Sequence, residues 1–69
     1  MVTYEIVKEI ATLSETDNAT KRLALVSWNG APAKIDIRSW LKDGKPLKGV
    51  TLNEDEARQL VEVLNDYYA

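Results

Sequence analysis

The chain has 69 residues, of which nine are basic and eleven acidic, and its formal net charge is −2. Cysteine and histidine are both absent, which excludes a disulfide and removes the ligands that most structural zinc sites use. A single domain of this length, residues 1–69, buries only about 60 % of the surface that its unfolded chain exposes. We therefore expect homodimerisation to supply additional stability.

Charge is segregated along the chain. Residues 21–49 contain seven basic and two acidic residues, whereas the segments on either side are acidic. Salt screens charge interactions beyond about 8 Å at physiological ionic strength. A ligand near residues 21–49 therefore meets their positive charge rather than the net charge of the chain, and this segment could attract nucleic acid.

Composition also argues against catalysis and export. Without histidine and cysteine the chain lacks the usual general base and thiol nucleophile, and Ser27 and Ser39 have no evident activating partner. We expect no enzyme, cofactor, metal or small-molecule substrate. Met1 to Glu5 lacks the start of an export signal, and no apolar stretch could span a membrane. We therefore expect a cytoplasmic protein, nucleoid-associated if bacterial, without membrane contact.

Residues 3–14 form the first element, and their pattern is ambiguous. The apolar residues Ile6, Ile10 and Leu13 are spaced as in a helix, but apolar and polar residues also alternate as in a strand. The tyrosine, valine, isoleucine and threonine content favours a strand. A polar turn follows over residues 15–20.

Residues 21–28 have strand composition, and Asn29-Gly30 is a strong turn signal. A hairpin therefore connects this strand to a third strand that starts near Lys34. Trp28 has the same parity as Val26, which favours a position in the core.

The third and fourth strands, Lys34 to Leu52, are the most informative stretch. In the third strand one side carries Lys34, Asp36, Arg38, Trp40 and Lys42, and the other carries Ile35, Ile37, Ser39 and Leu41. We expect the second side to be core and the first to be an exposed cationic surface. Trp40 could cover a sheet edge or stack on a base, and its place between two cations favours stacking. Asp36 is expected to pair with Arg38 or Lys34.

The turn at Asp43-Gly44 can be read in two registers. A two-residue loop would put Lys48 on the core side, whereas a three-residue loop with left-handed Gly44 pairs Leu41 with Lys45. The second register is preferred because it keeps Lys48 out of the core. It also pairs Arg38 with Lys48 and sets Leu47 opposite Ser39, so that Lys34, Arg38, Lys42 and Lys48 form a cluster around Trp40.

Leu52 to Glu56 is a helix start, with Asn53 as N-cap and Glu56 completing a capping box. The helix carries an apolar stripe, and we expect it to form a dimer interface through Leu60, Val61, Leu64, Tyr67 and Tyr68. The order of four strands and one helix predicts an α+β fold with an antiparallel sheet.

Three runs of sequence carry a resemblance to a known family. They are V-S-W-N-G-A-P-A-K-I-D-I-R (Val26 to Arg38), I-D-I-R-S-W (Ile35 to Trp40) and K-P-L-K-G-V-T-L-N (Lys45 to Asn53). With the helix that follows, they resemble the positive cofactor four family of single-stranded-DNA-binding transcriptional coactivators, especially its short bacterial members. The resemblance covers the chain from about residue 21 onward and the first strand loosely.

The resemblance implies a curved four-stranded antiparallel sheet with one C-terminal helix, dimerising to present a platform for single strands. It implies that Arg38 contacts the nucleic acid backbone and that Trp28 is the stacking aromatic. It matches Lys45 and Lys48 to the family's lysines, and Lys21 and Arg22 to its basic residues. Many eukaryotic members carry two adjacent aromatics where this chain has Trp40 and Leu41, and their regulatory tail is absent, so coactivator function is not inferred.

We therefore expect a non-catalytic protein that binds single-stranded DNA, serving transcription, replication or repair, because cations meet phosphates and an aromatic ring stacks on an unpaired base. A single-stranded RNA binder and a module that docks an acidic protein are the alternatives. The expected nucleic-acid contacts are Lys21, Arg22, Trp28, Lys34, Arg38, Trp40, Lys42, Lys45 and Lys48.

Overall fold

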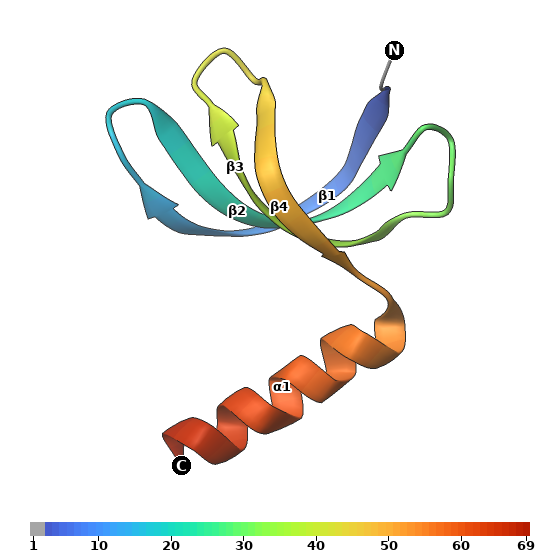
Figure 1. The fold of residues 1–69 in the computed structure, drawn as a ribbon, viewed down its shortest axis with the longest axis vertical. Helices are drawn as coiled ribbons and strands as arrows, with labels where there is room; N and C mark the ends of the chain where they lie inside the picture. The colour runs from blue at the N-terminus through green and yellow to red at the C-terminus, as the bar shows by residue number, and fades with distance from the viewer. Residues whose placement is uncertain (1–2) are drawn as a thin grey trace.

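A computed structural model describes residues 3–69, so Met1 and Val2, part of the segment used above to predict the absence of an export signal, lie outside the described residues. Four strands precede one helix: β1 (Tyr4–Glu15), β2 (Ala19–Trp28), β3 (Lys34–Leu41), β4 (Pro46–Leu52) and α1 (Glu54–Tyr68). The strands form one antiparallel sheet in the order β1-β2-β3-β4, and α1 lies on its convex side (Figure 1). The predicted α+β fold is confirmed. No helix within residues 3–69 is long and apolar enough to cross a membrane.

β1 is a strand, and three register shifts interrupt its pairing with β2. The pairing with β2 shifts at Val7, Ile10 and Leu13, and their exposed fractions are 53 %, 46 % and 52 %. Two of the three residues with helical spacing, Ile10 and Leu13, are therefore bulge residues, whereas Ile6 pairs regularly with Val26. Bulges bend the strand that carries them and discourage pairing at an open sheet edge.

The sheet is strongly curved (Figure 1). The helix shares its grooves with Ile35 and Ile37 on the convex side, so the opposite face of β3 is the concave one. Among the described residues, the buried hydrophobic ones are Ala24, Val26 and Trp40, with exposed fractions of 2 %, 0 % and 1 %, and the buried charged one is Asp36, at 1 %. Ala24 pairs with Asp36 and Thr20 with Trp40 across β2 and β3, so these residues share one face of the sheet.

The two faces of β3 are therefore buried in the opposite sense from the prediction. The side that carries Asp36 and Trp40 was expected to be an exposed surface, but the curved sheet closes around it. The side that carries Ile35 and Ile37 was expected to be core, and it is only half-buried in the single chain. Alternation gives the two faces correctly, but it does not reveal which face becomes concave.

The turn between β3 and β4 has the preferred three-residue form, followed by an unexpected bulge. Leu41 N–H donates to the Lys45 carbonyl over 2.8 Å, and Gly44 has a positive φ of 95°. Trp40 pairs with Pro46, in the same register, but further along the hairpin the register shifts and Arg38 pairs with Gly49 rather than Lys48. The expected pairing of Arg38 with Lys48 is wrong.

Gly49 has a steric reason to stand opposite Arg38. A Cβ at position 49 would lie 2.0 Å from Arg38 Cβ and 2.5 Å from the Ile37 carbonyl oxygen. Only glycine lets the two strands approach this closely, so the bulge shifts Gly49 into the place that a lysine could not occupy.

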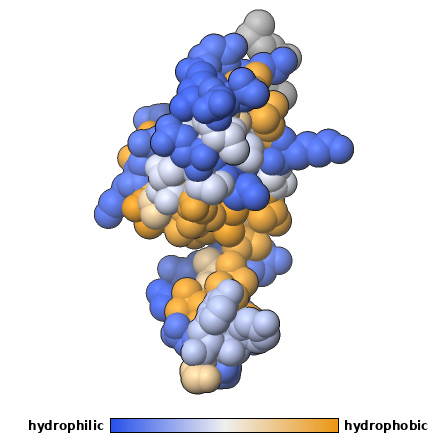
Figure 2. Space-filling model, turned by 90° about the vertical axis from the view of Figure 1, so that its left-hand side faces the viewer, coloured by the Kyte–Doolittle hydropathy of each residue, from blue (hydrophilic) through white to orange (hydrophobic). Residues whose placement is uncertain are grey.

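The helix begins as its sequence indicates and then packs sparsely. Asn53 Oδ1 accepts from Glu56 N–H at 2.8 Å, and Glu56 Oε1 accepts from Asn53 N–H at 2.9 Å, which completes the capping box. The helix contacts β3 and β4 only. Figure 2 shows apolar side chains between the sheet and the helix and polar ones over the far end of the sheet.

The close approach at Gly49 yields a stability prediction. Gly49→Ala should lower the free energy of unfolding by about 1–3 kcal/mol, because the added methyl group must displace backbone atoms. Urea denaturation followed by circular dichroism measures the change. Lys48→Ala, at an exposed position in the same strand, should stay within about 0.5 kcal/mol of the parent, and an equal loss in both variants would contradict the steric argument.

Candidate nucleic-acid interface

Three aromatic rings from three strands meet on the concave face. The centroid of Tyr4 lies 5.3 Å from that of Trp28 and 5.2 Å from that of Trp40, and the two tryptophan rings are nearly parallel at 6.3 Å. Tyr4 O–H donates to the Gly44 carbonyl over 3.0 Å, so it also ties β1 to the turn between β3 and β4. Sequence reasoning did not select Tyr4, since its strand has an ambiguous pattern.

The two tryptophans have the opposite exposures from those expected. Trp40 was expected to present its ring for stacking, but only 1 % of the residue is exposed, and the Arg22 guanidinium carbon lies 5.1 Å from its ring centroid. Trp28 is half-buried and lines a pocket. The expectation of an exposed Trp40 is wrong because the concave face closes over it, and Trp28 is the tryptophan that a ligand could reach.

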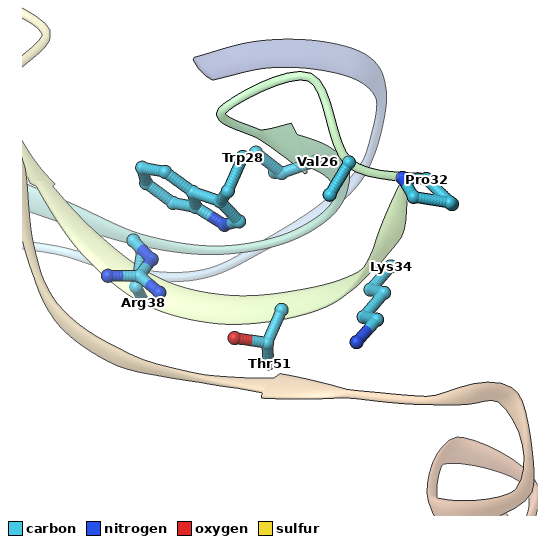
Figure 3. A pocket seen from close by; sticks show the side chains of 7 residues that line it. Val26, Trp28, Pro32, Lys34, Arg38 and Thr51 are labelled. Carbon is cyan, nitrogen blue, oxygen red and sulfur yellow. The ribbon is translucent and has the colours of Figure 1, made fainter. Parts of the chain in front are cut away.

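The pocket lies beside the hairpin between β2 and β3. Its volume is about 300 Å³, near the lower end of the range for small-ligand pockets. Figure 3 shows the Trp28 ring and the Arg38 guanidinium on one side and Lys34 on the other. The lining residues are Val26, Trp28, Ala31, Pro32, Lys34, Arg38 and Thr51. An aromatic wall, an apolar floor and a cation at the rim are the features that hold an unstacked base beside a phosphate.

Asp36 joins the aromatic and cationic sides of this pocket. Its carboxylate accepts hydrogen bonds from Arg38 Nε at 2.7 Å, Arg38 Nη2 at 2.9 Å and Trp28 Nε1 at 3.0 Å. The Arg38 guanidinium carbon lies 4.6 Å from the Trp28 ring centroid. The predicted pairing of Asp36 with Arg38 is confirmed.

The remaining basic residues fall into two groups. Arg22 forms an ion pair with Glu9, and Lys42 Nζ lies 3.0 Å from a Glu15 carboxylate oxygen. Lys34, Lys45 and Lys48 are exposed, and none of the three forms an ion pair with another residue of the range 3–69. Lys8 and Lys21 are likewise exposed and without an ion pair in that range, so the position of each lysine, rather than its free charge, decides whether it can serve the pocket.

The predicted cluster around Trp40 is only partly formed. Lys34 pairs with Val26 beside the Trp28 pocket, whereas Lys42 lies beyond the other end of β3. Lys21 pairs with Ser39 and therefore belongs to the convex face. The structure brings Trp28, Lys34 and Arg38 together and leaves Lys21 apart from them.

The convex face and the helix leave apolar surface uncovered. A groove of about 560 Å³ runs between them, lined by Ile37, Val50, Leu52, Asp55, Glu56, Gln59, Leu60 and Val63. Val61 lines a second groove near Ala57. Leu64, Tyr67 and Tyr68, also expected at a dimer interface, have exposed fractions of 44 %, 78 % and 77 %.

The complete burial of Trp40 predicts that its ring contributes strongly to the stability of the fold. Trp40→Ala should lower the free energy of unfolding by about 3–5 kcal/mol, because it removes the largest fully buried side chain. Thermal and urea denaturation measure the loss. Leu13→Ala, which truncates an exposed apolar residue of β1, is the control and should change stability little. A Trp40→Ala protein as stable as the control would show that the ring is dispensable to the core.

Two comparisons with known proteins find similar sequences. The family model described as Transcriptional Coactivator p15 (PC4) matches residues 16–63, which include β2, β3, β4 and most of α1. A relative from Treponema pallidum (strain Nichols), described as an uncharacterized protein, is 42 % identical over 64 residues, which cover 90 % of this chain and 75 % of the relative.

Proposed function

Since this chain belongs to the Transcriptional Coactivator p15 (PC4) family, we propose that it binds single-stranded DNA on the concave face of its sheet, without catalysing a reaction. The observation that carries the proposal is the pocket in which Trp28 and Arg38 face Lys34. It offers a ring to a base and an ammonium group to a phosphate within one cavity.

Strand selectivity follows from the chemistry of this pocket. A duplex keeps its bases stacked on one another, whereas a single strand can turn a base onto an aromatic side chain. Lys34 stands at the pocket, Lys45 ends the turn after β3, and Lys48 lies within β4. In this proposal a base enters against Trp28 and the flanking phosphates reach these lysines.

We also propose that the protein acts as a homodimer through the convex face and the helix. The grooves on that side are lined mostly by apolar residues, and the outer turns of α1 expose Leu64, Tyr67 and Tyr68. Extended apolar surface of this kind marks an interaction site in a small soluble domain. A second copy would cover it and leave both concave faces open to nucleic acid.

The site carries no feature that selects one cellular process, and transcription, replication and repair all expose single strands. Cytoplasmic location remains part of the proposal. Single-stranded RNA would use the same stacking and phosphate contacts, and an acidic protein would use the lysines without the pocket.

Fluorescence anisotropy with matched single-stranded and duplex DNA tests the proposed activity. The protein should favour single strands, and Trp28→Ala should cost about ten- to a hundredfold in affinity for them, as expected for one lost stacking contact. Duplex binding should change little. Leu13→Ala is the control, because it removes an apolar side chain outside the pocket.

Phosphate contacts by Lys34, Lys45 and Lys48 should give log affinity a slope of about −2 against log salt, at about −0.7 per phosphate contact. Competition by oligo-U would reveal RNA binding. Salt-dependent binding that does not distinguish single strands from duplex, with Trp28→Ala unaffected, would reject the pocket and favour a purely cationic docking surface.

Dimerisation has its own test. Leu64→Asp should convert a species of about twice the chain mass into monomer, or unfold it, because a carboxylate would be buried in the apolar contact. Sedimentation equilibrium at micromolar concentration measures the mass. Asn65→Asp introduces the same charge beside the apolar stripe and should leave the dimer intact. A folded wild-type monomer at these concentrations would overturn this part of the proposal.

A further inference from the structure

The Asp36 carboxylate is buried, and both of its oxygens accept hydrogen bonds. Only 1 % of the residue is exposed. Oδ1 accepts from Arg38 Nε, and Oδ2 accepts from both Arg38 Nη2 and Trp28 Nε1. One anion therefore holds the aromatic wall of the hairpin pocket and its guanidinium at the same time.

The surroundings of Asp36 extend this network across three strands. Its cross-strand neighbours are Ala24 in β2 and Thr51 in β4. Arg38 Nη1 donates to the Leu47 carbonyl at 2.8 Å, which ties the guanidinium to β4. Three of the five N–H donors of Arg38 are thus committed within the protein.

We propose that Asp36 is a positioning residue for nucleic-acid binding, an inference that rests on the proposed function. It fixes Trp28 and Arg38 in the geometry of the pocket before a strand arrives. It also neutralises Arg38, which then acts as part of the pocket wall rather than as a free phosphate ligand. Fixing side chains in advance removes an entropic cost that binding would otherwise carry.

Charge and position predict opposite effects when this anion is removed. Asp36 stands among cations, so charge alone predicts that neutralising it strengthens the attraction to phosphates. Positioning predicts weaker binding, because Trp28 and Arg38 lose their fixed places. The sign of the change in affinity therefore separates the two accounts.

Asp36→Asn is the direct variant, because it keeps the shape and removes the charge. The amide has one oxygen to accept hydrogen bonds, and its NH₂ group meets a donor on the other side. Affinity for oligo-dT should fall about tenfold, as expected for two side chains that must be ordered on binding. Asp17→Asn makes the same charge change at an exposed residue with no ion pair or side-chain hydrogen bond within residues 3–69, and it should not weaken binding.

A second pair of variants keeps the test decisive if Asp36→Asn does not fold, since removing one partner of a buried ion pair is destabilising. Arg38→Lys keeps the positive charge, but a lysine cannot form the bidentate hydrogen bonds that the guanidinium makes to a carboxylate. Trp28→Phe keeps an aromatic ring but loses the indole N–H. Positioning predicts that each lowers affinity, whereas charge alone predicts no change for either.

The complete experiment titrates these folded variants and the double variant Asp36→Asn/Trp28→Phe with oligo-dT. If Asp36 acts through Trp28, the double variant should lose less than the product of the two single losses. Folded Asp36→Asn that binds as tightly as the parent or more tightly, or losses that multiply fully, would overturn the proposal. Should Asp36→Asn not fold, undiminished binding by both Arg38→Lys and Trp28→Phe would do so.

Hydrogen exchange of the indole N–H groups tests the contact without DNA. The Trp28 indole proton should exchange slowly in the parent and faster in Asp36→Asn or, if that variant does not fold, in Arg38→Lys, while that of Trp40 should change less. Failure of the parent to bind oligo-dT would reject the proposed function, whereas equal exchange of the Trp28 indole in parent and variant would reject the positioning role of Asp36.

Discussion

Closure of the sheet around Trp40 is the constraint on which the rest of this structure depends. Few side chains within residues 3–69 are completely buried; they lie on the concave face, and Trp40 is the largest of them. A flat sheet would leave one side of the ring in water. Curvature lets residues from three strands cover it, and the bulges of β1 and the close approach of Gly49 to Arg38 accommodate that curvature.

Because the sheet closes on one side, its two faces differ in what they bury. Because the concave face supplies its own core, its outer rim can carry a pocket and charged residues without losing stability. The convex face has only one helix to cover it, and α1 contacts only two of the four strands. The apolar surface left over is a consequence of building the core on the other side, and it accounts for a helix whose outer turns expose leucine and tyrosine.

Sequence reasoning was most successful where local chemistry decides the structure. The Asn53 and Glu56 capping box, the left-handed Gly44 and the Asp36–Arg38 pair each depend on a few neighbouring residues, and all three are present. It failed where the answer depends on curvature. The exposures of Trp28 and Trp40 follow from how tightly the sheet bends, and residue alternation carries no information on that. The register at Gly49 depends on the close approach of β4 to Arg38, which alternation does not reveal either.

The arginines and the lysines of the sheet have different electrostatic roles. Arg22 and Arg38 each lie over a tryptophan ring, at 5.1 Å and 4.6 Å, and each is paired with a carboxylate. Planar, weakly hydrated guanidinium groups are suited to such partly buried places. The free charge at the binding face is therefore carried by lysines.

This division constrains how the protein can select its ligand. An ammonium group is a point charge that attracts any phosphate, so the lysines cannot tell a single strand from a duplex. The chain's net charge of −2 also gives no general attraction to the more highly charged duplex. Under the proposed function, discrimination then has to come from a part of the face that contacts a base rather than a phosphate. On the concave face that part is the Trp28 ring, whose position depends on a buried carboxylate rather than on exposed charge.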